Sequence, residues 1–265
     1  MHIETISCGQ GAPSMVLLWL AGTRKIPATL SITADTGWER DMLWNTGRRS
    51  TAKEYFNEVT QPFAAEMGIE AVFVRAQDGN GNDLPDIDVA HTLHGYDDIP
   101  LFGSEGGRLQ QSCTSKWKVA AIRQEARRRG ATTMRSAIGL HMAETRRMKV
   151  SDVKWHTHYY PLITDFPMYR TTIQETLDRL GVPWLTNTQC DGCPHKDRQR
   201  WLNTSEATIQ NLVGVEDVFI RDGFYLTSSR RPLAEYINNI RFADQNQPEM
   251  VFDDPGCSSG GYCFT

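Results

Sequence analysis

Three cysteines in this chain have the residue type and spacing of metal or redox ligands. Cys190 and Cys193 form a C-x-x-C in the stretch QCDGCPH, a spacing that lets two thiolates reach one metal ion or cluster. His195 follows two residues later and is a further candidate ligand for zinc. A lone C-x-x-C also suits a redox dithiol. The chain has no second C-x-x-C, so zinc would need Cys113 or a cysteine from the end of the sequence.

A second candidate site is the small-residue loop SCGQGAPS, which precedes an apolar run near residue 15. Its small or hydroxyl-bearing residues are Ser7, Gly9, Gly11 and Ser14. Pro13 stands where a helix would begin. Two interpretations stay open. The loop is an ordinary strand-to-helix turn, or it is a cradle whose backbone N–H groups bind phosphate at the start of that helix.

Alternating strands and helices must position these groups. The sequence pattern predicts strands over residues 2–7, 28–35, 69–76 and 133–140, and helices over 14–24, 51–68, 115–130 and 169–183. Such alternation favours an α/β fold, with a parallel sheet covered by helices on both faces. Ligands in that architecture lie beyond the carboxyl ends of the strands. The SCGQGAPS loop, and Asp35 and Thr36 in the stretch ADTGWE, both fall at such ends.

Two segments break the alternation. Residues 77–107 are rich in Gly, Asp, Asn and His, and we expect an insertion or lid loop there rather than a core element. After residue 240 the sequence turns irregular and glycine-rich, ending in GCSSGGYCFT. The sequence therefore predicts an irregular, cysteine-bearing C-terminal region.

Composition excludes several classes of protein. The net charge of −4 provides no global basic field for nucleic acid or an anionic membrane. No apolar run approaches the ~18 residues of a membrane span, and the first residues lack a charged leader with an apolar core. We therefore expect a cytoplasmic protein without a membrane partner. Six cysteines in that compartment indicate metal or redox chemistry rather than disulfides.

Taken together, these stretches resemble the phosphoadenosine phosphosulfate (PAPS) reductase-like family of the ATP-pyrophosphatase, or adenine nucleotide α-hydrolase, superfamily. The first loop matches the family's S-x-G-x-G-x-x-S pattern, and ITADTGWE is similar to its D-T-G-W-E segment. CTSKWKVAAIR resembles its Cys-x4-Lys helix start, and GLHMAETRRMK its G-I-S-x-D-E-x-x-R-M-K segment. YYPLI and CDGCPH follow in the expected order, so the resemblance spans about residues 3–201.

The resemblance implies an adenine-nucleotide-binding domain over residues 1–185 and a C-x-x-C region over 186–265 that packs on it. The implied ligand is ATP or a sulfonucleotide, with Mg²⁺ as a companion of ATP. The residues implied to hold it are Ser7, Gly9, Gly11, Ser14, Asp35, Thr36, Gly139 and Arg147. The resemblance also implies a [4Fe–4S] cluster on Cys113, Cys190 and Cys193, and a thiol reductant or a nucleic-acid acceptor as partner.

Departures from the family pattern leave alternatives open. Cys113 is followed by Thr114, where cluster-bearing members have a second cysteine, so the fourth ligand is Cys257, Cys263 or none. Cys263 is also a candidate nucleophile on a glycine-rich tail, with Asp35 as a second catalytic residue. Pro13 replaces an acidic residue of the pyrophosphatase loop, which puts efficient ATP cleavage in doubt.

Two reactions and one non-catalytic role fit this set of residues. In the first reaction, a tail thiolate attacks the sulfur of a sulfonucleotide, and a thiol reductant resolves the product. In the second, ATP is cleaved between its α- and β-phosphates and the adenylated acceptor receives sulfur. The alternative is an adenine-nucleotide sensor or binding subunit in a defence or regulatory assembly, which Pro13 favours if it blocks the chemistry.

Overall fold

A parallel five-stranded sheet forms the centre of the protein. The computed structural model describes residues 1–94 and 98–246, so Cys257 and Cys263 lie outside the described residues. The sheet has the order β5-β2-β1-β7-β8, and all four neighbouring pairs are parallel. Its strands are β1 (His2–Cys8), β2 (Leu30–Asp35), β5 (Glu70–Arg75), β7 (Thr133–Ile138) and β8 (His156–Tyr159).

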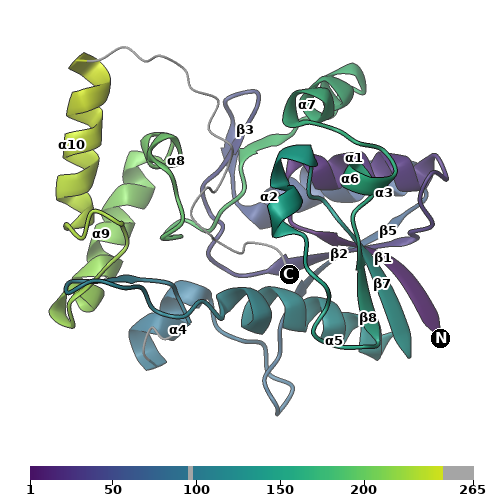
Figure 1. The fold of residues 1–265 in the computed structure, drawn as a ribbon, viewed down its shortest axis with the longest axis horizontal. Coiled ribbons are helices and arrows are strands. Elements are labelled where there is room, and N and C mark those ends of the chain that lie inside the picture. Colours follow the sequence, from purple (N-terminus) through teal and green to yellow (C-terminus); the bar gives the residue numbers. More distant parts are fainter. Residues whose placement is uncertain (95–97, 247–265) are drawn as a thin grey trace.

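Helices cover both faces of this sheet (Figure 1). One face carries α1 (Ala12–Gly22), α3 (Gln61–Glu66), α6 (Pro161–Thr164) and α7 (Arg170–Arg179). The other face carries α5 (Ala120–Arg128), which continues a π-helical segment, η2 (Thr114–Val119). The expected α/β class, with a parallel sheet between two layers of helix, is confirmed, and the arrangement is that of a Rossmann-like fold.

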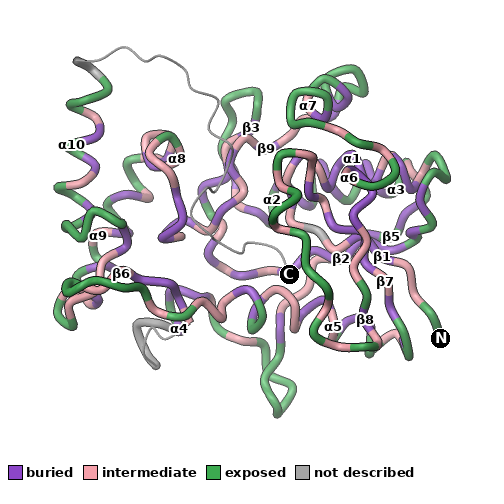
Figure 2. The backbone as a smooth tube through the Cα atoms, viewed as in Figure 1, coloured by how far each residue is buried: buried purple, intermediate pink, exposed green. Residues whose placement is uncertain are grey.

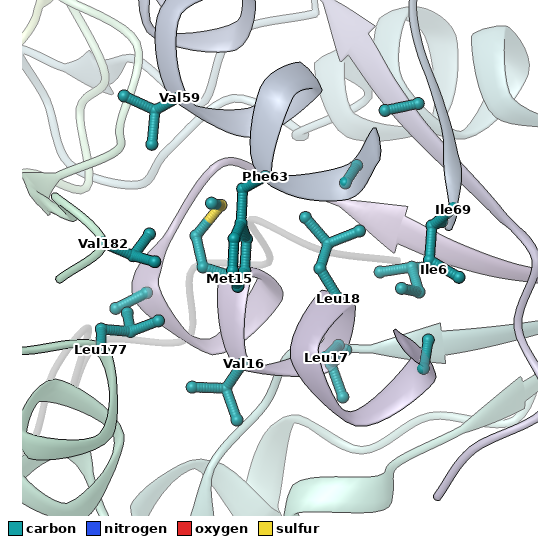
Figure 3. Close-up of a cluster of buried hydrophobic side chains, with 14 of the residues drawn as sticks. Ile6, Met15, Val16, Leu17, Leu18, Val59, Phe63, Ile69, Leu177 and Val182 are labelled. Atoms are coloured by element: carbon teal, nitrogen blue, oxygen red, sulfur yellow. The ribbon is translucent and has the colours of Figure 1, made fainter. Parts of the chain in front are cut away.

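Helix α1 is the centre of the larger core because it is apolar on every side. Met15, Val16, Leu17, Leu18 and Leu20 are all fully buried. A helix without a polar face must be covered all round. Here the sheet covers one side and α3 and α7 cover the others, as the side chains in Figure 3 show. This packing fixes the position of the loop that precedes α1.

The predicted helix over 51–68 forms in three parts. It begins at α2 (Ala52–Tyr55), passes through a π-helical turn (Phe56–Thr60) and ends as α3. Thr51 and Glu54 form a capping box at its start. Beside it, a small antiparallel sheet in the order β4-β3-β9 consists of β3 (Met42–Trp44), β4 (Arg49–Ser50) and β9 (Leu185–Asn187).

The segment 77–107 is not a bare loop, which corrects the sequence prediction. It contains α4 (Ile87–His94) and β6 (Phe102–Gly103). Ile87 and Leu101 are buried in a second apolar cluster, together with Trp38 and Trp117. The sequence pattern hid this helix because acidic residues and histidines separate its few apolar residues.

The irregular region expected after residue 240 is corrected as far as residue 246, because a helix continues to that point. The described part of the chain after residue 197 is mainly helical. It contains α8 (Arg198–Leu202), α9 (Glu206–Arg221), β10 (Phe224–Tyr225) and α10 (Leu233–Asn246). β10 pairs with β6, and the helices lie to one side of the main sheet (Figure 1). Figure 2 shows the buried residues that join them to the rest of the molecule. The buried carboxylate of Glu216 accepts hydrogen bonds from the backbone of Leu226 and Leu233, which holds α9 against α10.

Within the described residues, no helix is both long and apolar enough to cross a membrane.

Candidate functional site

The candidate site lies where the strand order of the main sheet reverses. Chain connections run outward from β1 toward β2 and β5 on one side, and through β7 to β8 on the other. β1 and β7 are therefore neighbours whose following loops diverge, and such a switch point leaves a crevice at the carboxyl edge of the sheet. Ser7 of β1 is paired with Ile138 of β7, directly before the two loops.

The two loops meet closely at the start of α1. Gly11 is the N-cap of α1 and Pro13 lies within its first turn. Gly139, which follows β7, packs against that turn. A Cβ atom at Gly139 would lie 3.0 Å from both the backbone nitrogen and Oγ of Ser14. Glycine at 139 therefore allows the β7 loop to approach the helix start, which explains why both segments border one pocket.

This pocket, named here the arginine pocket, gathers most of the nucleotide-binding residues expected from sequence. Those it brings together are Ser7, Gly9, Gly11, Ser14, Gly139 and Arg147. The first four come from the end of β1, the β1–α1 loop and the start of α1. Arg147 ends a short 3-10 helix after β7 (Met142–Arg147). Residues about 130 positions apart in sequence thus line one cavity, because the strands before them are neighbours.

The arginine pocket has an excess of positive charge. Arg147, Arg170 and Arg200 line it, and Glu144 is the carboxylate among its described lining residues. Arg147 is ion-paired with Glu144, whereas Arg170 forms no ion pair within the described part of the chain. Burial lowers the pKa of His141 in the same pocket, and the arginine charges add to that effect against the opposing effect of Glu144. The pocket therefore suits a ligand with several negative charges.

A second pocket, named here the apolar pocket, lies on the α5 side of the same loop. Its apolar lining residues are Ala34, Val119, Ile122 and Ile138. Ser7 and Gly9 line both pockets, so the β1–α1 loop is the wall between them. Ser7 Oγ in this wall is buried and has no hydrogen-bond partner among the described residues. Buried polar atoms rarely stay unsatisfied in proteins, so this hydroxyl is suited to a ligand or a water molecule.

Two residues that sequence reasoning did not assign form the polar side of the apolar pocket. Glu39 and Lys118 form an ion pair with 2.9 Å between Oε1 and Nζ. Both line the pocket and both are mostly buried. Glu39 is the last residue of the D-T-G-W-E stretch and Lys118 lies in the Cys-x4-Lys helix start. The two motifs that contain Glu39 and Lys118 were therefore the sequence signal that could have assigned these residues to the site.

His156 closes the sheet side of the apolar pocket as a neutral side chain. Its Nδ1 accepts a hydrogen bond from Arg123 Nε at 3.3 Å, and its Nε2 lies 2.8 Å from Ser136 Oγ. Burial, together with the neighbouring His158 and Arg123, lowers the pKa of His156 to about 3, against the opposing effect of Asp152. Protonation would place an unpaired charge beside Arg123, so the folded protein holds this imidazole in its neutral form.

Acid is expected to destabilise the protein through this histidine. An unfolded histidine binds a proton near pH 6.5, whereas His156 in the folded state binds one only near pH 3. The stabilisation is complete above pH 6.5 and is lost progressively as the pH falls from 6.5 toward 3. We expect a loss of about 1–2 kcal/mol in unfolding free energy between pH 7 and pH 5. Urea unfolding at the two pH values measures it.

The matched variant for this test is His156→Gln, which removes the titrating group. Its unfolding free energy should be lower at pH 7 but should change less between pH 7 and pH 5. Part of the pH dependence will persist, because burial and Arg108 also lower the pKa of His195, to about 4. An equal pH dependence in wild type and His156→Gln would show that His156 does not carry the effect.

Asp35 and Thr36 do not join the other expected nucleotide-binding residues. Asp35 is ion-paired with Arg75 at 2.6 Å and accepts a hydrogen bond from the Gly37 backbone at 2.8 Å. Thr36 is buried, and its Oγ1 accepts a hydrogen bond from the Trp38 backbone. Neither residue is among the described lining residues of the two pockets. In this structure they hold the D-T-G-W-E turn in shape.

Two of the cysteines of the expected cluster, Cys113 and Cys190, pack against the second apolar cluster, which also contains Trp38 of the D-T-G-W-E turn. Cys190 Sγ lies 3.8 Å from Thr36 Oγ1 and 3.7 Å from Glu39 Oε1. Burial raises the pKa of the Cys190 thiol; Glu39 and Cys113 raise it further, while Lys118 opposes them. Cys193 follows in a tight turn, its backbone N–H bonded to the Cys190 carbonyl.

The cysteines expected to hold the cluster form no metal site among the described residues. Among the described residues, no three His, Cys, Asp or Glu side chains are grouped so that they would hold a metal. The [4Fe–4S] cluster stays a prediction from the resemblance.

Comparison with known proteins does not extend this description: a scan against models of protein families matches none of them, and no curated protein matches the chain in sequence.

Proposed function

We propose that the chain binds an adenine nucleotide across the wall between the two pockets and takes part in adenylate-dependent sulfur chemistry. One observation carries the proposal. A single loop containing Ser7 and Gly9 separates an apolar pocket from a pocket with an excess of arginine. A nucleotide has the same two-part character, a flat weakly polar base and a strongly negative phosphate chain, joined by a ribose.

The phosphate end is suited to the arginine pocket. The β1–α1 loop brings small residues and the start of α1 to its inner end, where backbone N–H groups and the helix dipole favour anions. Arg147 adds a charged hydrogen-bond donor. Ser7 Oγ, buried in the dividing wall, has an unused hydrogen-bonding capacity at the expected position of the ribose or the α-phosphate.

The base end is suited to the apolar pocket. Ala34, Val119 and Ile122 offer apolar contacts, and the Glu39–Lys118 ion pair is charge-balanced. The histidines there, His156 and His158, both have a lowered pKa because they are buried, so they add no charge at neutral pH. A neutral base is therefore favoured over an anionic group on this side of the loop. Adenine in particular follows from the resemblance to the PAPS reductase-like family.

Activation of an acceptor by ATP is the reaction that we assign to this arrangement. Reduction of a sulfonucleotide needs a thiolate at the sulfur atom, and its candidate, Cys263, lies outside the described residues. In the ATP reaction an acceptor atom attacks the α-phosphorus, and pyrophosphate leaves. Arg147 would stabilise the developing negative charge and orient the phosphate chain.

Pro13 is compatible with binding but weakens the loop as a catalyst. It removes one backbone N–H from the first turn of α1, where a phosphate oxygen would otherwise find a donor. Such a loop still binds phosphate through its remaining donors. A chain that binds the nucleotide without cleaving it would act as a sensor.

Calorimetry with ATP, AMP and adenosine 5′-phosphosulfate tests the proposal directly. We expect binding of all three. We also expect release of pyrophosphate from ATP once a suitable acceptor is present, and release of AMP once a sulfur donor displaces it from the adenylated acceptor. GTP serves as the control for the base. If the protein binds the adenine nucleotides but does not cleave ATP with any acceptor tested, the result would support a non-catalytic nucleotide sensor instead. Absence of binding by all three would overturn the proposal.

A further inference from the structure

The outer end of the arginine pocket has recognition groups that the adenine nucleotide does not require. Arg170, Gln174 and Asp178 are spaced four residues apart along α7 and so lie on one face of that helix. Arg170 and Gln174 line the pocket, and Asp178 Oδ1 accepts a hydrogen bond of 2.9 Å from Trp184 Nε1. The indole of Trp184 therefore lies alongside this row of side chains, and it also lines the pocket.

Trp184 is held in a fixed orientation. Its backbone nitrogen donates to Asn45 Oδ1 at 3.2 Å, and its carbonyl accepts from the Asn45 backbone at 2.8 Å. The indole is half-buried against the α1 side of the core. The hydrogen bond from its ring nitrogen to Asp178 immobilises the side chain in the folded protein. Binding of a ligand to its aromatic face therefore costs little further side-chain entropy. Such a preorganised ring is suited to stacking.

The chemistry of this end matches a nucleobase with an attached phosphate. Aromatic rings stack on bases of any sequence. The side-chain amide of Gln174 carries both a donor and an acceptor, as the edge of a base does. Arg170, which forms no ion pair within the described part of the chain, is a bidentate donor to phosphate.

We infer that Trp184, Gln174 and Arg170 form a second subsite that binds a nucleotide unit of the acceptor. The base of this nucleotide unit stacks on Trp184, and the edge of the base forms hydrogen bonds with Gln174. The phosphate of the unit binds Arg170. The identification of this ligand as the acceptor rests on the proposed function, because the subsite opens into the pocket assigned to the α-phosphate. The nucleotide unit comes either from a free nucleotide or from an unpaired base of a single-stranded nucleic acid.

Fluorescence anisotropy with labelled ten-nucleotide single strands of RNA and DNA tests the subsite. Each strand is titrated with protein in the absence of AMP and at saturating AMP. Trp184→Ala is expected to weaken binding of the strand about tenfold or more, and Trp184→Phe much less, because stacking requires an aromatic face. Arg170→Ala should weaken binding and reduce its dependence on salt. Trp19→Phe is the control, since Trp19 is half-buried against the same core and outside both pockets.

Competition by free UMP and GMP distinguishes the two sources of the ligand. Displacement of the strand by free nucleotides at micromolar concentration indicates a nucleotide acceptor, whereas displacement only by other strands indicates nucleic acid. Either result supports the subsite. A melting curve for each variant shows that it is folded. If Trp184→Ala is not folded, the comparison uses Trp184→Phe and Arg170→Ala.

Calorimetry with AMP on the same variants separates the possible failures. The subsite requires that Trp184→Ala weaken strand binding at least fivefold more than AMP binding. Equal losses for the two ligands would mean that the AMP base itself stacks on Trp184, which overturns the inference. Wild-type protein that binds AMP but neither strands nor free UMP or GMP would also overturn it. Wild-type protein that binds strands through Trp184 but no adenine nucleotide would overturn the proposed function instead.

Discussion

Replacing Gly11 by leucine is expected to weaken adenine-nucleotide binding at least a hundredfold while the fold is retained. Gly11 has extended backbone angles (φ −70°, ψ 161°) that any residue adopts, so the substitution causes no backbone strain. A Cβ atom there would lie 3.5 Å from Pro13 Cδ and 3.6 Å from Thr188 Cγ2, which are ordinary contacts. The remaining carbons of leucine would have to enter the arginine pocket, which Gly11 and Thr188 both line.

Two milder variants calibrate this result. Gly11→Ala adds only the Cβ atom and is expected to weaken binding by less than tenfold. Ser7→Ala removes one hydroxyl and is expected to cost a few-fold, since a single hydrogen bond contributes about 1 kcal/mol. Calorimetry with AMP measures all three affinities, and thermal melting shows that each variant is folded. Undiminished binding by folded Gly11→Leu would show that the phosphate groups do not lie against this loop.

Replacing Gly192 by alanine is expected to lower the unfolding free energy by about 3 kcal/mol, at the upper end of the range for overpacked cores. Gly192 lies inside the C-x-x-C turn, and a Cβ atom there would lie 2.2 Å from Trp38 Cζ2 and 2.9 Å from Leu212 Cδ2. Trp38 is buried and its rigid indole has no free space to move into. The variant must displace the turn from the D-T-G-W-E segment.

Gly214→Ala is the matched control, since it is also a glycine-to-alanine change. Gly214 is exposed in the middle of α9, and a Cβ atom there would meet nothing within 4 Å. Alanine in a helix interior is more favourable than glycine by about 0.5–1 kcal/mol, so this variant should be more stable than wild type. Urea unfolding measures both. Similar stability of the two variants would show that the C-x-x-C turn is not packed on Trp38.

The strands and helices of the first half followed from the sequence because their apolar patterns are strong. The apolar run of α1 had to be a buried helix, and β2 and β5 had to be strands, since each carries enough apolar residues to bury itself. Helix α4 was missed for the opposite reason. It has few apolar residues of its own, and Ile87 is buried only because Trp117 and the segment around Leu101 cover it.

The candidate site divides in the same way. The loop from Ser7 to Ser14 was recognisable because small residues before a buried helix form a local pattern. The roles of Asp35 and Glu39 could not be recognised from the sequence. The two residues are only four positions apart, but each is held by a different distant residue. Arg75, brought alongside by the pairing of β2 with β5, engages Asp35, while Lys118 on η2 holds Glu39 at the apolar pocket.

By itself, the sequence determined the α/β class, the start of α1 and the small-residue loop, because periodicity, glycine and proline act within a few residues of the chain. Only the tertiary structure decided which charged side chains neutralise one another and which stay available. Those pairings depend on strand order and helix packing between segments far apart in sequence. The same packing brought Trp184 beside the α7 face that carries Arg170 and Gln174, and it set Cys190 of the C-x-x-C against Glu39 instead of the arginine pocket.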